Sequence, residues 1–341
     1  ADDLKKASTS YLEFAKKYPD RQEAPEALLS AAALYKRMGN TAQQIAMLEQ
    51  FIKQYKKDQP RTTNIIEAHV QIADTYLDLE KVAKTPAAKE QNRKLALANY
   101  RSAVGLFRQD LEPLASFYAA KAQLVLEKPE QDSFRAMKIT GRTGKEQSDQ
   151  MTAMLKKLTD LTAKNEAIIK AYAQPVWNAE SLRRIGDLYM HLAKTMLKAP
   201  CPRDVASIDD FACDEYLVLL EDKAAILEEK ALNAYKQAYE IAITAYDAPP
   251  ELVNNILAGL KTLKPNDYQQ VGNLLESPET GSVLGLGKML SDGKMASTLH
   301  PAELGEKVLE DKKPAKEPEV KPEDIAPVKK PQDEFLEEDF Q

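Results

Sequence analysis

The chain has 341 residues, of which 47 are basic and 53 acidic, so its formal net charge at pH 7 is −6. The two signs are spread together along the sequence, without the basic stripe that nucleic-acid binding requires. No apolar run reaches the roughly 18 to 20 residues of a membrane-spanning helix. Glycine is scarce and the alternating pattern of a β-strand is absent, which favours helix nearly everywhere. We therefore expect an all-α chain with no transmembrane segment and no nucleic-acid partner.

Small and aromatic residues recur at two fixed spacings. In the first, a small residue is followed four positions on by an aromatic or large apolar residue, and three positions later by another apolar residue. Its copies are Ala7, Tyr11 and Phe14, then Gln44, Leu48 and Phe51 in a weaker form, then Ala96, Tyr100 and Ala103, and finally Ala231, Tyr235 and Ala238. In the second, a small residue precedes a tyrosine by three positions: Ala32 with Tyr35, Ala73 with Tyr76, and Gly186 with Tyr189.

Together these spacings resemble the two helices of a tetratricopeptide repeat, in which small residues let neighbouring helices approach and aromatic residues fill the groove between them. The resemblance implies a right-handed α-solenoid of helical hairpins over residues 1–277, with Tyr35, Tyr76, Tyr189 and Tyr235 largely buried. It also implies a non-enzymatic protein–protein interaction scaffold, because such repeats bind a protein or peptide ligand in the groove that they form.

The first copy matches the second helix of a repeat, yet only a few residues precede Ala7. We expect the solenoid to begin in the middle of a repeat, with Leu4, Tyr11 and Phe14 forming an apolar face that lacks a partner helix. A chain extended upstream is then expected to be more stable than this one. The alternative is a signal peptide removed just before Ala1.

Proline, glycine and asparagine divide the first third of the chain into helices. Pro25 begins a helix that ends at Gly39 and Asn40, and the next runs from Thr41 to about Lys57. The following pair is expected at about 62–79 and 89–108. The turn that joins this pair, 80–88, is longer than the usual tight corner of the repeat.

The middle of the chain departs from the repeat. After Pro113 a helix is expected to reach Glu127, where Lys128 and Pro129 end it. A long helix follows at about 145–173, and its apolar residues at spacings of three and four predict one buried stripe. We interpret it as a packing helix of the array rather than as a coiled-coil dimer seam. Further helices are expected from Pro175 to about 198 and from Pro250 to about 263.

Two cysteines, Cys201 and Cys213, flank one loop, 201–213. A disulfide across this loop would stabilise the fold by about 3 kcal/mol. No CxxC spacing or histidine partner accompanies the pair, so a bridge is favoured over a metal or redox site. A bridge implies an oxidising compartment such as the periplasm, whereas two free thiols would suit a cytosolic protein.

The stretch around these cysteines carries a second resemblance. Trp177, Gly186, Tyr189, the turn 200–202 and Tyr235 are similar to the C-terminal part of large tetratricopeptide proteins of predatory and gliding bacteria, a group that includes envelope components of adventurous gliding motility. The resemblance implies a scaffold in a trans-envelope assembly, in the periplasm or at the outer membrane. The alternatives are a cytosolic adaptor or chaperone-like module, and a regulatory subunit of an envelope or peptidoglycan enzyme.

Residues of catalytic and metal-binding type stand apart from one another in the sequence. His69, His191 and His300 have no histidine or cysteine three or four positions away, as a metal site on one helix requires. The glycine-rich stretch 281–288 has the wrong spacing for a phosphate-binding loop and lacks a hydroxyl residue after its lysine. We therefore expect no catalytic site, no cofactor and no metal.

Ligand contacts are instead expected in the groove of the solenoid, at exposed neighbours of the small residues. The mixed charge of these positions favours neither a strongly acidic nor a strongly basic ligand, and each residue taken alone is better explained as part of a solvated helix face. The candidate positions are Lys36, Arg37, Gln71, Asp74, Arg183 and Asp187.

The end of the chain has a different composition. Periodicity decays in residues 278–310, which we expect to be irregular or to form short helices. Residues 311–341 are rich in lysine, glutamate and proline and are expected to be a disordered tail. Phe335, Leu336 and Phe340 lie in its acidic end, which suits either a linear docking motif or a solvated tail without a partner. These three residues are also candidate covers for the apolar face at Tyr11.

Overall fold

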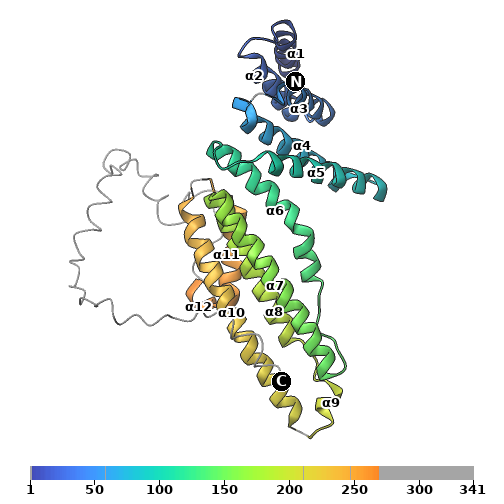
Figure 1. Cartoon of the computed structure of the whole chain (residues 1–341), viewed down its shortest axis with the longest axis vertical. Coiled ribbons are helices and arrows are strands. Elements are labelled where there is room, and N and C mark those ends of the chain that lie inside the picture. The colour runs from blue at the N-terminus through green and yellow to red at the C-terminus, as the bar shows by residue number, and fades with distance from the viewer. Residues whose placement is uncertain (1, 58, 210, 246, 269–341) are drawn as a thin grey trace, which may run out of the picture. The chain divides into compact units, whose positions relative to one another are not determined.

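The structure, a computed structural model, describes residues 2–57, 59–209, 211–245 and 247–268. Within these residues the chain is helical and no strand is formed, which confirms the all-α prediction for this part (Figure 1). The segment 278–310, the tail 311–341 with Phe335, Leu336 and Phe340, the glycine-rich stretch 281–288 and His300 all lie outside the described residues.

The helices follow one another with mostly short connections. Their bounds are α1 Asp2–Lys17, α2 Ala24–Arg37, α3 Thr41–Tyr55, the 3-10 turn η1 Gln59–Arg61, α4 Thr62–Val82, α5 Pro86–Leu106, α6 Pro113–Arg135, α7 Gly144–Tyr172, α8 Pro175–Leu197, α9 Arg203–Ala206, α10 Ala212–Thr244, α11 Pro250–Leu263 and α12 Pro265–Tyr268. Across the described part of the chain, none of these helices is both long enough and apolar enough to cross a membrane.

Helices pack against their neighbours along the chain, which is the arrangement of a helical repeat. The pairs α2 and α3, α4 and α5, α6 and α7, and α8 and α10 form hairpins, and each second helix also contacts the first helix of the next unit. In addition, α4 contacts α6, α6 contacts α8, and α8 contacts α11, so these first helices form a continuous layer. α1 contacts α2 as the second helix of a hairpin would.

The apolar core is assembled in the same stepwise way. Phe51 is fully buried in a cluster that joins α1 to α4, and Tyr100 is fully buried in the next cluster, between α4, α5 and α6. Phe134 and Met154 are fully buried in a third cluster, which joins α6, α7, α8 and α10. Each cluster shares a helix with the next, so burial is continuous although each helix meets few others.

The predicted end of α6 at Lys128 is wrong, because the helix continues through Pro129 to Arg135. A proline inside a helix removes one hydrogen bond and costs about 3 kcal/mol. Beyond it, however, Gln131 and Phe134 are only 2% and 0% exposed. Burial of this last turn and a half in the third cluster offsets the cost of the proline.

The predicted long turn at 80–88 is also wrong. α4 extends to Val82 and α5 begins at Pro86, which leaves three residues between them. Proline suits the first turn of a helix, where its missing N–H has no partner to lose. The side chain of Thr85 caps the same helix by accepting a hydrogen bond from the Ala88 amide at 3.2 Å. Local start signals therefore account for the shorter turn.

Turn chemistry agrees with the sequence elsewhere. Gly39, which follows α2, has φ of 70°, a left-handed conformation that glycine adopts without strain. It is exposed, so its part in the repeat is to form the turn rather than to fill a helix interface. The long helix expected at 145–173 corresponds to α7, whose N-cap Thr143 and residue Glu146 form a capping box.

Candidate functional site

The two cysteines are joined by a disulfide, with their Cα atoms 5.6 Å apart. The loop between them is more ordered than expected, since it contains the short helix α9, and Cys213 lies in the first turn of α10. The carboxylate of Asp204 in α9 accepts hydrogen bonds from the Gly144 amide at the start of α7, at 2.8 and 3.0 Å. The bridge thus holds the beginning of α10 next to the loop after α8, and α9 in the bridged loop contacts the beginning of α7.

The buried side chain of Gln147 links the same elements by hydrogen bonds. Its side chain is fully buried, and its amide nitrogen donates hydrogen bonds to the carbonyl oxygens of Gly141 and Pro200 at 2.9 and 2.8 Å. Its amide oxygen accepts a hydrogen bond from the Tyr216 hydroxyl of α10 at 2.6 Å. One amide therefore links the loop before α7, the loop after α8, and α10.

The aromatic residues of the first spacing differ in burial. Tyr100 and Tyr235 are buried together with the alanines of their copies, Ala96, Ala103, Ala231 and Ala238, and Gln44, Leu48 and Phe51 are buried as well. Tyr11 is 43% exposed, which corrects its assignment as a packing residue, and Ala7 and Phe14 are half-buried. These three residues line an open hollow of about 570 Å³ between α1 and α2.

The second spacing gives partly buried tyrosines. Tyr35, Tyr76 and Tyr189 are half-buried, less completely than Tyr235, and Tyr76 and Tyr189 pack against the core clusters. The small residues that precede them, Ala32, Ala73 and Gly186, are buried. The small residue therefore faces the neighbouring helix, while the tyrosine three positions on lies at the edge of the interface.

Asp74, expected to face a ligand, instead takes part in helix packing. Its carboxylate accepts a hydrogen bond from the buried Tyr100 hydroxyl of α5 at 2.6 Å and pairs with Lys121 of α6 at 2.6 Å. Nearby, Tyr118 of α6 donates a hydrogen bond to Glu67 of α4 at 2.7 Å. These polar side chains of α4 therefore bind α5 and α6 within the fold rather than facing a ligand.

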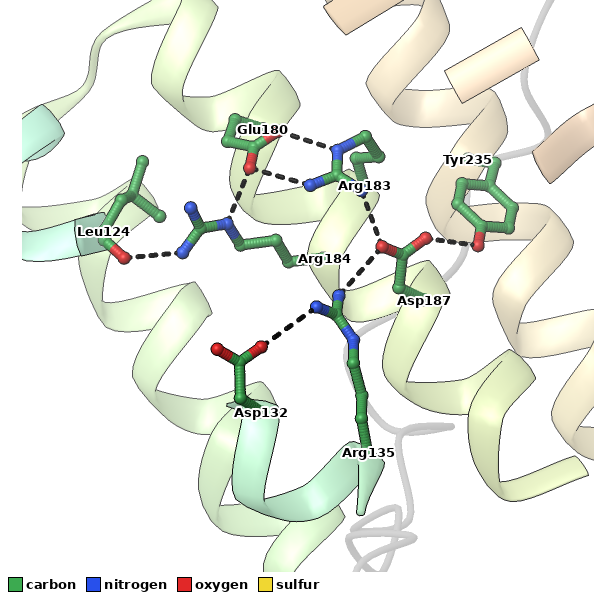
Figure 2. A network of polar contacts seen from close by, with 8 residues as sticks. All are labelled: Leu124, Asp132, Arg135, Glu180, Arg183, Arg184, Asp187 and Tyr235. Carbon is green, nitrogen blue, oxygen red and sulfur yellow. Dashed lines mark hydrogen bonds and ion pairs between the residues drawn. The ribbon is translucent and has the colours of Figure 1, made fainter. Parts of the chain in front are cut away.

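Asp187 repeats this arrangement in a later hairpin. Its carboxylate accepts a hydrogen bond from the buried Tyr235 hydroxyl of α10 at 2.8 Å and pairs with Arg135 of α6 at 3.1 Å (Figure 2). The Tyr235 ring lies between two glycines, because a methyl group placed on Gly186 or Gly259 would approach ring atoms to 2.7 Å. Glycine at both positions lets α8 and α11 close on the ring.

The two buried tyrosines should remain protonated at high pH. Burial raises the pKa of Tyr100 and of Tyr235, and the carboxylates of Asp74 and Asp187 raise it further. A folded-state pKa above the unfolded value of 10.0 gives stability that is fully present below pH 10 and is lost as the pH rises above it. We expect an ultraviolet tyrosinate titration in which these residues ionise only as the helical circular-dichroism signal is lost.

The variant Tyr100→Phe is the control for that titration, because it removes one tyrosine from the late phase and leaves the early phase unchanged. A titration in which every tyrosine ionises near the unfolded value while the chain stays helical would contradict the expectation.

The carboxylate of Asp187 belongs to a larger network on α8. Arg183 contacts Glu180 through two nitrogens, at 2.7 and 2.8 Å, and reaches Asp187 with a third at 2.6 Å. Arg184 contacts Glu180 at 2.6 Å and donates to the backbone carbonyl of Leu124 on α6, also at 2.6 Å (Figure 2). The guanidinium groups are therefore held in fixed positions between α6 and α8.

Charge and burial oppose each other in this network. Burial alone would raise the pKa of Glu180, but the hydrogen bonds and charges of Arg183 and Arg184 outweigh it and lower that pKa. Burial likewise acts to lower the pKa of Arg183, and its contacts with Glu180 and Asp187 raise it overall. Glu180 and Arg183 are therefore both charged at neutral pH.

A groove of about 730 Å³ opens over this network. α6, α8 and α11 line it, together with Tyr235 of α10, and three of these helices belong to the continuous layer of first helices. Five basic side chains face two acidic ones in its lining, although the whole chain is acidic. The basic residues are Lys128, Arg135, Arg183, Arg184 and Lys194, and the acidic residues are Glu180 and Asp187.

Several polar groups of the groove are left without a partner in the described part of the structure. Lys128 and Lys194 are exposed and take part in none of its ion pairs. The amide nitrogen of the buried Gln131 and Nε2 of His191 have no hydrogen-bond partner. Burial lowers the pKa of His191, with Arg135 adding to the effect and backbone hydrogen bonds opposing it. The groove therefore offers donors and positive charge.

Only two of the six groove positions expected from the sequence lie in this groove, namely Arg183 and Asp187. Gln71 donates a hydrogen bond to Glu67 on its own helix at 2.9 Å. Lys36 and Arg37 are exposed in the last turn of α2, away from the groove lining. Lys128 and Arg135 were missed because the predicted break at Lys128 removed the end of α6. Glu180, Arg184 and Lys194 lie on α8, where the residue spacing singled out only the neighbours of Gly186.

Neither His69 nor His191 belongs to a group of potential metal ligands in the described part of the chain. His69 contacts Asn99 at 2.9 Å, and burial lowers the pKa of His69 more than this contact raises it. Among the described residues, no group of three or more histidine, cysteine, aspartate or glutamate side chains is placed to hold a metal ion.

Comparison with known proteins adds little to this description. No family model matches the chain, and no curated protein matches it. One solved structure that resembles it comes from the computational design of self-assembling cyclic protein homo-oligomers; it is 13% identical, with coverage of 77% of this chain and 95% of that one. The TM-score is 0.24, so this likeness carries no argument about fold or function.

Proposed function

We propose that the protein is a non-enzymatic interaction scaffold of the tetratricopeptide type, whose groove between α6, α8 and α11 binds an acidic peptide segment of a partner protein. The observation that carries the proposal is the groove itself, with five basic and two acidic side chains in its lining. A surplus of positive charge in the groove of an acidic chain favours a ligand of opposite charge.

The chemistry of the groove supports a carboxylate ligand in particular. Arg135, Arg183 and Arg184 are already oriented by carboxylates of the protein, so little side-chain freedom is lost when a ligand binds. Lys128 and Lys194 supply the charge that is not yet compensated. The free amide nitrogen of Gln131 provides a buried donor, and a buried donor gains more from a partner than an exposed one does.

The placement of this scaffold in a bacterial cell envelope is part of the proposal. Its support is the disulfide between Cys201 and Cys213, since such bridges persist in oxidising compartments such as the periplasm. A tetratricopeptide scaffold of a trans-envelope or gliding-motility assembly agrees with both the bridge and the residue spacings.

Fluorescence anisotropy with two labelled synthetic peptides tests the ligand class. One peptide is rich in glutamate and aspartate, and the other has lysine at the same positions. We expect the acidic peptide to bind more tightly, with an affinity that falls as salt is added. The double variant Lys128→Glu with Lys194→Glu should weaken this binding by about tenfold or more, because each reversal replaces attraction by repulsion.

The matched control is the double variant Lys36→Glu with Arg37→Glu, which makes the same change in net charge at exposed sites outside the groove. It should bind the acidic peptide as the unmodified chain does. Equal losses in the two double variants, or equal binding of the two peptides, would show that the groove does not select an acidic ligand.

A further inference from the structure

A second surface is formed by the first half of α10, near the disulfide. Large apolar side chains with high exposure are concentrated in this region: they are Leu197, Ile208, Phe211, Leu217, Val218, Leu219 and Ile226. Soluble monomers seldom expose a contiguous apolar patch of more than a few hundred Å², so such a concentration marks an interaction surface.

Val218, Leu219 and Ile226 lie on the side of α10 opposite to its core contacts. Leu220, Ala224 and Leu227 are buried in the third cluster and form one stripe of the helix. At 100° per residue, Val218 and Asp222 lie on the opposite side. Six residues define what we call the α10 outer face: Glu215, Val218, Leu219, Asp222, Ile226 and Glu229.

Charge and apolarity alternate on the α10 outer face with a spacing of seven. Glu215, Asp222 and Glu229 form one row, and Leu219 and Ile226 form the row beside it. All five are exposed, and the three carboxylates take part in none of the ion pairs shown by the described residues. A seven-residue repeat is the spacing at which one helix presents the same row to a second helix packed along it.

We propose that the α10 outer face is a docking surface for a basic amphipathic helix of a partner protein. An apolar stripe of that helix would cover Val218, Leu219 and Ile226, and lysine or arginine residues at heptad spacing would pair with the acidic row. The three carboxylates of the acidic row favour a basic partner, because opposite charges attract across an interface.

The disulfide supports this assignment by fixing where the surface begins. Cys213 lies in the first turn of α10 and is bonded to Cys201, and Phe211, which is 73% exposed, immediately precedes that turn. A surface that is held in place before binding loses less conformational freedom when a partner docks. This proposal is independent of the α6–α8–α11 groove, which lies on other residues.

The test uses the full oxidised chain and two labelled synthetic helical peptides. Both have leucine along one stripe; one has lysine at the flanking heptad positions, and the other has glutamate there. We expect the lysine peptide to bind at least about tenfold more tightly than the glutamate peptide. In the triple variant Glu215→Lys, Asp222→Lys and Glu229→Lys, the preference between the peptides should reverse.

Three further variants test this result. Glu13→Lys, Glu49→Lys and Glu166→Lys change the net charge by the same amount at exposed positions on α1, α3 and α7, and this triple variant should keep the original preference. The double variant Leu219→Ser with Ile226→Ser should weaken binding of the lysine peptide by about tenfold, because the two apolar side chains that the peptide would bury are removed. Val82→Ser, at a similarly exposed apolar residue of α4, should have no effect.

Three results would overturn the proposal. Equal effects of the two triple variants would show a response to net charge alone. Lysine-peptide binding that becomes tighter in Lys128→Glu with Lys194→Glu and is unchanged in the acidic-row triple variant would place the peptide in the groove instead. Dimerisation of the chain at neutral pH that Leu219→Ser with Ile226→Ser abolishes, seen by analytical ultracentrifugation, would make a second copy the occupant.

Discussion

Replacement of Tyr235 by alanine should lower the free energy of unfolding by about 3 to 5 kcal/mol, as truncation of other buried aromatic side chains does. The reason is that Tyr235 is buried between Gly186 of α8 and Gly259 of α11, so its removal leaves a cavity where three helices meet. Urea denaturation followed by circular dichroism measures the change. The conservative variant Tyr235→Phe removes only the hydrogen bond to Asp187 and should cost about 1 to 3 kcal/mol.

Tyr11→Ala is the matched control for Tyr235→Ala. Tyr11 occupies the same place in the residue spacing, but it is exposed on α1, and its truncation should change the stability by less than about 0.5 kcal/mol. Equal effects of the two alanine variants would contradict the packing described for Tyr235. Gly259→Ala tests the other side of the contact and should cost about 1 to 3 kcal/mol, because the added methyl group forces the ring to move.

Loss of the disulfide should lower the free energy of unfolding by about 3 kcal/mol, the loop-entropy value for a bridge of sequence separation 12. The variant Cys201→Ser with Cys213→Ser and the reduced form of the unmodified chain should both show this loss in urea denaturation. Hydrogen exchange should show it first in α9 and in the first turns of α10, since the bridge and the contact from Asp204 to Gly144 hold these elements.

A reductant provides the control for the disulfide prediction. It should lower the stability of the unmodified chain and leave the double serine variant unchanged. Unmodified protein with the same denaturation midpoint in the presence and absence of reductant would show that the bridge contributes nothing to the folded state.

The sequence predicted the helices well where punctuation and periodicity agree. Pro25, Gly39 and Asn40 mark the limits of α2 and α3, and the apolar stripe of α7 marks that helix. The prediction failed where burial in the core opposed a local signal. In α6, Pro129 predicted the end of the helix, but the helix continues to Arg135. Local propensity carries no information about the core that buries Phe134 one turn further on.

The aspartate–tyrosine contacts could have been read from the sequence. Asp74 and Asp187 each follow the small residue of the second spacing, and each precedes a hairpin partner that carries Tyr100 or Tyr235. In the first hairpin the position of the aspartate is taken by Ala33 and that of the tyrosine by Leu48. An aspartate is thus present in the two hairpins in which a buried tyrosine hydroxyl needs an acceptor. It is absent in the first hairpin, where leucine replaces the tyrosine.

The groove charge could not have been predicted in the same way. Its lining combines α6, α8 and α11, which are more than a hundred residues apart from first to last. The sequence placed Arg183 and Asp187 at the correct site because they neighbour Gly186, but it gave no reason to bring Lys128 and Lys194 to the same opening. That information lies in the packing of α6 on α8.

The proline in α6 also bears on what holds the groove wall in place. Pro129 lies between Lys128 and Gln131, both in the groove lining, and its missing N–H leaves the carbonyl oxygen of Val125 without the donor that a regular helix supplies. The last turns of α6 carry Gln131 and Arg135 of the groove lining together with the buried Phe134. This wall of the groove is therefore held by burial in the core as well as by the helix itself, so a substitution that loosens the third cluster would also displace the donors that line the opening.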